Sequence, residues 1–291
     1  MNVGRHTETP SCMFSKTKDI SRFFLMTFIW SWVLWAPLVL GSLKIVPVSG
    51  KLISILTLPL INLGAFGPLA GALFVLRQQK GKGSSRTYLR SFLDLNLGWK
   101  TYVIPIIIFG GSTFIAWFFP ELLGEKRLSM LLPSIWVFIP CLFYMTFLGG
   151  GQEEFGWRGY ALPILENKFG IWFANIILGI VWAFWHIPLW FITGTSQTYM
   201  NFGGFILLMV GYSFIFSWIR KISGNRPFSG MYVHGLSNAF ISIMPTLTVQ
   251  INMPQTRFWI WVTLTFLIGI VITGLRKNRS MNLTYPRSSE P

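Results

Sequence analysis

Two adjacent carboxylates stand inside an otherwise apolar stretch of this sequence. The run 149–159 is rich in glycine and contains Glu153, Glu154 and Arg158. An ionised side chain near the centre of a bilayer costs about 2.5–3.5 kcal/mol on insertion scales. Two acids in such a position are expected to serve a chemical or structural purpose, and they are the first candidate functional residues.

The spacing of these three residues predicts different roles for them. Glu154 and Arg158 are four positions apart with the acid first, the favourable order for an ion pair along one helix face. Glu153 points about 100° away from Glu154 on a helix. We therefore expect Glu154 and Arg158 to neutralise each other, and Glu153 to be the carboxylate available for catalysis.

Two further polar motifs lie on later apolar runs. Trp182 precedes His186 by four positions, and His234 precedes Asn238 by four positions. Residues four apart project from the same helix face, so His234 and Asn238 are expected to point into one space. A carboxylate, one imidazole, and an imidazole with a carboxamide could thus converge from three helices.

These side chains suit the hydrolysis of a peptide bond by an activated water molecule. A carboxylate assisted by a histidine can deprotonate water as a general base. Donors such as His234 and Asn238 can stabilise the oxyanion that forms on the carbonyl group. Ser237 lies off the face that His234 and Asn238 share, so the pattern does not indicate a covalent nucleophile.

The same groups could instead bind a divalent metal such as zinc. Glu153, His186 and His234 would supply one carboxylate and two imidazoles, which is adequate for a catalytic zinc site with an open position. The local zinc signature His-Glu-x-x-His does not occur in the sequence. The residues alone leave a glutamate-activated water and a metal-activated water as alternatives, and no cofactor is certain.

Composition places these motifs in a membrane protein. The chain is 52% hydrophobic and 11% charged, whereas soluble domains carry about 25% charged residues. Its lysines and arginines give a net charge of +15, but they form short clusters between apolar runs, as topology signals do. We therefore expect a multi-pass integral protein of the cell membrane that binds no nucleic acid.

The apolar runs predict an all-α, polytopic helical bundle. About twenty apolar residues cross a bilayer as a helix. Eight runs approach or exceed this length: 23–42, 52–76, 102–119, 131–158, 170–191, 202–219, 227–247 and 258–275. We expect polar tails at 1–22 and 276–291, with a single bundle at 23–275 whose motif core is 149–240.

The basic clusters predict how the bundle is oriented. They occur in the N-terminal tail, around residues 77–100, around 220–226 and in the C-terminal tail. The positive-inside rule then places both termini in the cytoplasm, which agrees with an even number of spans. Residues 77–100 would form the one sizeable cytoplasmic loop.

Helix geometry leaves one inconsistency in this scheme. At about 1.5 Å per residue, Glu153 and His234 lie roughly 12 and 10 Å from the cytoplasmic helix ends. His186 lies roughly 24 Å deep if its helix begins at Gly170. Convergence requires either that residues 160–172 form a submerged segment buried in protein, or that these boundaries are wrong.

The three motifs together resemble those of the CPBP family, which comprises the type II CAAX prenyl endopeptidases and the bacteriocin-processing or Abi proteins. The motifs are Glu153-Glu154-x-x-x-Arg158, Trp182-x-x-x-His186 and His234-x-x-x-Asn238. Each motif alone is weak, but the three occur in the family's order on separate apolar runs. The resemblance implies an all-helical intramembrane endopeptidase.

The resemblance also implies a role for each motif residue. The roles are the water-activating acid for Glu153, its supporting pair for Glu154 and Arg158, the second-motif histidine for His186, and the oxyanion-side pair for His234 and Asn238. At Trp182 the family more often has phenylalanine, so the aromatic character is kept.

The partners implied by the resemblance are a membrane-associated peptide or protein substrate and the surrounding lipid bilayer. A prenylated protein tail and a bacteriocin-like or pheromone-like peptide both fit this class. Two other functions use the same residues. One is a non-catalytic immunity or scaffold protein, and the other is a proton-coupled transporter, because intramembrane Glu and His also mark ion pathways.

Overall fold

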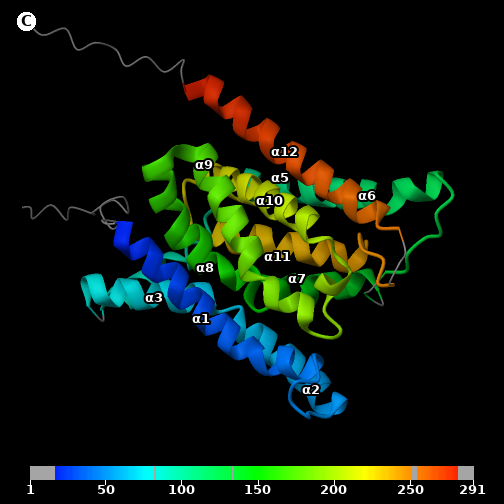
Figure 1. Ribbon diagram of the computed structural model, residues 1–291. Helices are drawn as coiled ribbons and strands as arrows, with labels where there is room; N and C mark the ends of the chain where they lie inside the picture. Colours follow the sequence, from blue (N-terminus) through cyan, green and yellow to red (C-terminus); the bar gives the residue numbers. More distant parts are fainter. Residues whose placement is uncertain (1–16, 82, 131, 133, 251–253, 281–291) are drawn as a thin grey trace, which may run out of the picture.

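The computed structural model describes residues 17–81, 83–130, 132, 134–250 and 254–280. All regular elements in these residues are helical (Figure 1). Six stretches are long and apolar enough to cross a membrane: Asp19–Ser42, Gly50–Lys80, Trp99–Leu122, Ile135–Phe191, Phe202–Ile222 and Thr256–Leu275. The prediction of an all-α, multi-pass membrane bundle is therefore confirmed.

The predicted tails lie mostly outside the described residues. The part of 1–22 that is described belongs to a helix, because α1 begins at Thr17. The last helix, α12, runs to Ser280, beyond the predicted end of the bundle at 275. The bundle therefore extends several residues further at both ends than the apolar runs indicated, since a helix does not have to end where its hydrophobic stretch ends.

Three helices form one side of the bundle (Figure 1). Helix α1 (Thr17–Ser42) packs against both α2 (Gly50–Gly64) and α3 (Gly67–Lys80). A Cβ atom on Gly71 would lie 2.5 Å from the Thr27 hydroxyl, so only glycine allows α3 to approach α1 this closely. The predicted span 52–76 lies within the single candidate membrane-crossing stretch Gly50–Lys80, in which a turn at residues 65–66 separates α2 from α3.

The opposite side is built from the third and sixth of the candidate membrane-crossing stretches. Helix α5 (Trp99–Pro105) continues through a π-helical stretch, Ile106–Gly110, into α6 (Gly111–Leu122). Helix α12 (Thr256–Ser280) packs against α6 and against α10 (Phe202–Ile222). These helices cover one side of the central group, whereas α7 (Phe138–Phe147) keeps exposed apolar side chains such as Ile139 and Phe143.

The central group carries the three motifs. It contains α7 (Phe138–Phe147), α8 (Glu154–Gly156), α9 (Leu162–Trp185), α10, and α11 (Phe228–Ile243). Helix α10 packs against α9 and α11, α11 packs against α7, and α8 contacts α3. Each motif therefore lies on an element that has neighbours on several sides.

The predicted span 131–158 is wrong as a continuous helix. Helix α7 ends at Phe147, and Gly150 has φ 131°, a region that glycine enters much more readily than other residues. A 3₁₀ turn at Gly151–Glu153 then leads into α8. The run of three glycines explains the break, because glycine is a poor helix former. The acids consequently stand just after a backbone irregularity.

The chain reverses direction within α9. Trp182 Nε1 donates to Glu153 Oε2 at 2.7 Å, although 29 positions separate the two residues. A straight helix of that length would hold them about 43 Å apart. Gly170 has φ 74° and ψ 169° inside α9 and marks the reversal, which is visible in Figure 1 as two arms joined at one end.

This reversal removes the inconsistency in depth. Glu153 lies 17 positions before Gly170 (170 − 153) and His186 lies 16 positions after it (186 − 170). Two helical arms of nearly equal length bring the two side chains to the same level. The boundary assumed at 158–170 was therefore wrong, and Leu162 and Leu165 in that stretch are buried in the bundle.

Candidate active site

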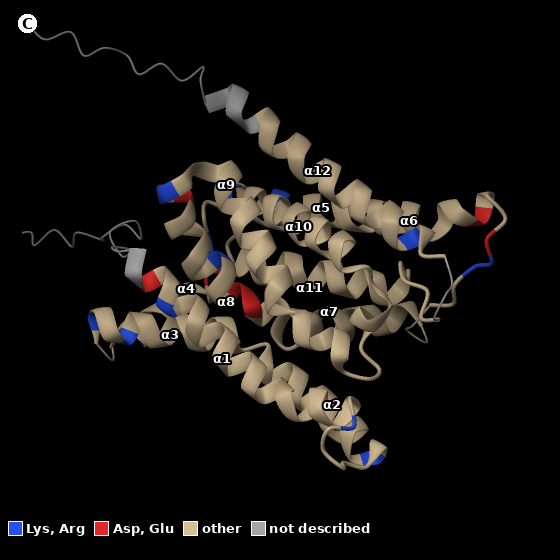
Figure 2. Cartoon of the chain, viewed as in Figure 1, with Lys and Arg blue, Asp and Glu red and all other residues tan. Residues whose placement is uncertain are grey.

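The motif acids lie inside the bundle. Figure 2 shows acidic residues at α8 in the interior, whereas most other charged residues stand near the ends of helices. Glu154 and Arg158 are 0% exposed and Glu153 is 5% exposed. Charged groups at this depth require partners, because burial removes them from bulk solvent.

Glu154 is the centre of an ion-pair network. Its Oε1 accepts hydrogen bonds from Arg158 Nη1 at 2.9 Å and from His234 Nδ1 at 3.0 Å. Arg158 Nη2 also donates to the Ser213 hydroxyl at 3.2 Å. The ion pair expected from the i,i+4 spacing is present, and His234 is a second partner that the spacing did not indicate.

The guanidinium group of Arg158 is also fixed by aromatic rings. It lies 4.3 Å from the ring centroid of Trp182 and 4.8 Å from that of Phe216. Cation–π contacts of this kind stabilise a desolvated cation by about 2 kcal/mol. Arg158 stands in a π-helical turn, Trp157–Ala161, and such turns are frequent at functional sites.

Glu153 has a different environment from Glu154. Its Oε2 accepts hydrogen bonds from Trp182 Nε1 at 2.7 Å and from Trp157 Nε1 at 3.3 Å. Within the described part of the chain, no group donates to its Oε1 and no cation pairs with it directly. One carboxylate oxygen is therefore held by two indoles, and the other is available to a ligand.

His234 and Asn238 face the same small space. A Cβ atom on Gly150 would lie 2.6 Å from His234 Nε2 and 2.7 Å from Asn238 Nδ2. Asn238 Nδ2 also donates to the carbonyl oxygen of Gly149 at 2.8 Å. The prediction that these two side chains project together is thus confirmed, and glycine at position 150 keeps the space between them free.

Gln152 holds the glycine-rich loop that borders this space. The amide N–H of Gly150 donates to Gln152 Oε1 at 2.9 Å, and Gln152 Nε2 donates to the carbonyl of Leu148 at 2.7 Å. Gln152 is fully buried. It fixes the backbone immediately before the catalytic candidate Glu153, and sequence reasoning did not single it out.

Gly150 provides a first test of this geometry. We expect Gly150→Ala to lose all function and to unfold at a lower temperature, because its Cβ would collide with His234 and Asn238 and its φ of 131° would be strained. Gly124→Ala is the matched control, since Gly124 also has positive φ but open space around it. Equal behaviour of the two variants in thermal unfolding would contradict the close approach at Gly150.

His186 adjoins the network without a hydrogen bond to it. Its Nδ1 donates to the carbonyl oxygen of Trp182 at 2.8 Å, which leaves Nε2 as an acceptor. Its ring packs at 4.6 Å from Trp185, and it lies close enough to His234 for electrostatic interaction. The ring of Trp182 contacts both histidines. The structure therefore brings His186 beside the site through Trp182.

A metal-activated water stays an alternative to the glutamate-activated water. In the described part of the chain, no group of three or more His, Cys, Asp or Glu side chains is close enough together to hold a metal ion. Glu153 Oε2 and the Nδ1 atoms of His186 and His234 are engaged in protein hydrogen bonds, which leaves Glu153 Oε1 and the two Nε2 atoms without one. A metal-binding histidine ordinarily donates its other ring nitrogen in this way, so these hydrogen bonds are compatible with both alternatives.

Two tryptophans belong to the site: Trp182, which is part of the second motif, and Trp157, which lies between Glu154 and Arg158 in the first. Trp157 follows Glu153 by four positions, so the i,i+4 spacing was a usable signal for its contact. Trp182 is contributed by the returning arm of α9, and its hydrogen bond depends on the reversal at Gly170. Both indoles are at most 1% exposed, and both donate to the same oxygen of Glu153.

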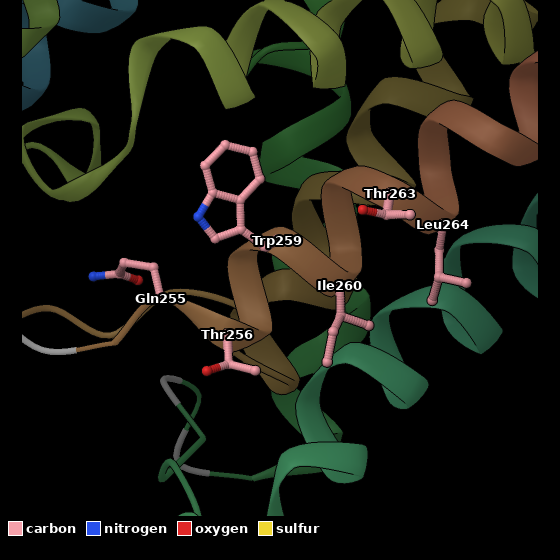
Figure 3. A pocket seen from close by; sticks show the side chains of 6 residues that line it. All are labelled: Gln255, Thr256, Trp259, Ile260, Thr263 and Leu264. Atoms are coloured by element: carbon pink, nitrogen blue, oxygen red, sulfur yellow. The ribbon is translucent and has the colours of Figure 1, made fainter.

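A separate shallow groove of about 510 Å³ lies along α12. Figure 3 shows the residues that line it, which are Gln255, Thr256, Trp259, Ile260, Thr263 and Leu264. None of them belongs to the three motifs, so this groove is not assigned to the catalytic candidate.

Comparisons with known proteins agree with the motifs. Residues 133–240 match the family model "Type II CAAX prenyl endopeptidase Rce1-like". The chain is 25% identical over 181 residues to "CAAX prenyl protease 2" of Methanococcus maripaludis, covering 60% of this chain and 64% of that protein. It is 28% identical over 138 residues to "Lysostaphin resistance protein A" of Staphylococcus haemolyticus, covering 45% of this chain and 34% of that protein.

The matched region contains every motif residue described above. It runs from just before α7 to Phe240 in α11 and so includes the glycine-rich loop, the acids, both arms of α9, and the histidine helix. The alignments cover less than two thirds of either relative's own length, 64% and 34% respectively. On this evidence, the chain is a multi-pass membrane protein whose motif region is similar to the type II CAAX prenyl endopeptidases.

Proposed function

We propose that this protein is an intramembrane endopeptidase in which Glu153 activates water to hydrolyse a peptide bond. The observation that carries the proposal is the asymmetry of the Glu153 carboxylate. Two indoles bind its Oε2, while its Oε1 accepts no hydrogen bond within the described part of the chain. A relative named as a CAAX prenyl protease, and a family model whose match spans the residues of all three motifs, support the same reaction class.

The two carboxylates of the site outnumber the one guanidinium group that faces them. Glu153 and Glu154 carry two negative charges when ionised and Arg158 carries one positive charge, so the three together have a net charge of −1. A net charge is costly in a low-dielectric interior. The His234 imidazole, whose Nδ1 donates to Glu154 Oε1 at 3.0 Å, is the neighbouring group that can carry a compensating positive charge.

The resulting arrangement suits attack by water on a carbonyl carbon. Glu153 Oε1 accepts a proton from water, whose oxygen forms a bond to the carbonyl carbon. The carbonyl oxygen becomes an oxyanion, and the protonated imidazole of His234 and the carboxamide of Asn238 stabilise it by hydrogen bonds from Nε2 and Nδ2. Collapse of the intermediate breaks the C–N bond, and Glu153 returns its proton to the leaving amine.

The hydroxyl groups near the site have other roles. The Ser237 hydroxyl donates to the carbonyl oxygen of His234 at 2.8 Å, and the Ser213 hydroxyl accepts from Arg158. Neither hydroxyl is hydrogen-bonded to an imidazole nitrogen, as an activated serine nucleophile would be. The geometry therefore favours water as the nucleophile.

The location of the site indicates the class of substrate. Glu153, His186 and His234 are at most 9% exposed and lie within the membrane-crossing bundle. A substrate must therefore come from the membrane or its surface, as a membrane-associated peptide or protein. A prenylated protein tail and a bacteriocin-like or pheromone-like peptide both belong to this class.

The experiment that tests this function compares membrane peptides in cells that carry the wild type or Glu153→Ala. We expect mass spectrometry to find peptides that are shortened only in the wild-type cells, with uncut forms accumulating in the variant cells. Identical peptide sets would contradict the proposal. Rescue of a deletion strain by a variant lacking Glu153, His186 and His234 would instead favour a scaffold or immunity protein. Glu153-dependent uptake into proteoliposomes would favour a transporter.

A further inference from the structure

We propose that residues 83–99 form a docking surface for anionic phospholipid headgroups of the leaflet on which they lie. The first support is their position in the fold. They connect two membrane-crossing stretches, because the stretch that includes α3 ends at Lys80 and the next begins at Trp99. Both ends of the segment are thereby held at the membrane surface, where headgroups are the immediate neighbours.

The segment has one buried face and one basic face. Helix α4 (Gly83–Ser91) and the turn after it bury Ser85, Tyr88 and Phe92, which are spaced as one helix face. Arg86 and Arg90 lie on the opposite face and are exposed. Among the described residues no acidic side chain pairs with either arginine. Two free cations therefore face outward.

Exposed apolar side chains accompany these cations. Leu93 is 75% exposed, Leu95 is 54% exposed and Trp99 is 69% exposed. A plain topology signal requires only basic residues, whereas an element bound in the headgroup region combines basic residues with exposed leucine and tryptophan. The combination fits an anionic membrane surface, because each basic residue near such a surface adds to the affinity.

The buried face of the segment contacts the element that carries the acids. The Tyr88 hydroxyl donates to the carbonyl oxygen of Phe155, the residue that follows Glu154. The ring centroids of Phe92 and Phe155 lie 4.2 Å apart. A Cβ atom on Gly159 would lie 2.6 Å from Cζ of Phe92. Headgroup binding to the outer face would therefore restrict the motion of the segment that carries Glu153 and Glu154.

The far end of the segment contacts the element that carries His234. Asp94 Oδ2 accepts a hydrogen bond from Arg226 Nε at 2.8 Å, and Arg226 stands two positions before α11 begins. Arg226 holds the pKa of Asp94 below its ordinary value, so the pair stays ionised at neutral pH. The lipid-facing segment thus bridges the elements of the first and third motifs.

Hydrogen exchange in lipid nanodiscs tests this inference without reference to proteolysis. The protein is placed in phosphatidylcholine alone or in phosphatidylcholine mixed with phosphatidylglycerol. We expect anionic lipid to slow amide exchange across residues 83–98 of the wild type. The double variant Arg86→Gln/Arg90→Gln should lose this protection. The affinity of the segment for anionic lipid should fall by about fivefold for each arginine removed.

The matched control removes the same charge at the opposite membrane face. Lys44→Gln/Lys51→Gln replaces two exposed lysines near the connection between α1 and α2, and it should keep the full effect of anionic lipid. Equal exchange of the wild type in both lipids would overturn the inference, as would unchanged protection in the arginine variant. Neither result would bear on whether Glu153 supports peptide hydrolysis, so the two proposals fail separately.

Discussion

Purified Glu153→Gln protein is expected to fold normally and to lose kcat by about 10²–10⁴-fold, the contribution typical of a general base. Glutamine keeps a carbonyl oxygen that can accept hydrogen bonds from Trp157 and Trp182, as Glu153 Oε2 does. It cannot take a proton from water. The substrate for this assay is a peptide that the cell comparison identifies, and kcat and KM are measured separately.

Two controls make this result specific to catalysis. Glu121→Gln removes a carboxylate that pairs with Arg127 far from the motifs, and it should keep the wild-type kcat. Thermal unfolding of Glu153→Gln should resemble that of the wild type, because both indole contacts have an acceptor. Full turnover by Glu153→Gln, with the controls behaving as described, would remove Glu153 from the reaction.

Replacing Arg158 with methionine is expected to lower the free energy of unfolding by about 3–5 kcal/mol, because it leaves a buried carboxylate without its main counterion. Arg158 is fully buried, and it binds Glu154 at 2.9 Å and Ser213 at 3.2 Å. Among the described residues, the hydrogen bond from His234 Nδ1 would then be what remains to Glu154 Oε1. Thermal or denaturant unfolding in detergent measures the loss.

A double variant separates the ion pair from simple packing. Arg158→Met with Glu154→Gln should lose less stability than the sum of the two single variants, since neither charge is then left unpaired. Arg127→Met serves as the surface control and should unfold like the wild type, because its partner Glu121 lies in an exposed pair. Strict additivity in the double variant would show that the pair does not couple.

The overall architecture could be predicted from the sequence, because a segment that crosses lipid must be apolar along its length. A span must be a long apolar helix, so the apolar runs located α1, α10 and α12 to within a few residues. The i,i+4 rule likewise predicted the ion pair between Glu154 and Arg158. These features depend on residues that are close together in the chain.

Contacts between residues that are far apart in the chain could not be predicted from the sequence. The reversal at Gly170 brings Trp182 within hydrogen-bond distance of Glu153, although 29 positions separate them. A single glycine in the sequence does not predict such a reversal. The contact of His234 with Glu154 spans 80 positions. Hydropathy could not locate the break after α7 either, because glycine residues are tolerated in apolar runs.

The irregular backbone around the acids is consistent with a functional site. The chain passes from α7 through the Gly150 turn and a 3₁₀ turn into α8, and then through a π-helical turn. Non-helical backbone is tolerated at membrane depth only where protein or a water-filled cavity surrounds it. Here Gln152 and the packing of α3, α7 and α11 provide those surroundings.

The central claim is that water activated by Glu153, and not a protein side chain, attacks the peptide bond. Cleavage of an identified substrate by purified wild-type protein in the presence of hydroxylamine tests it most directly, with products and protein analysed by mass spectrometry. The account predicts that the new C-terminus is a carboxylate alone and that the protein carries no adduct. A hydroxamate product, or a peptide fragment bound to the protein, would reveal a covalent acyl intermediate and contradict the account.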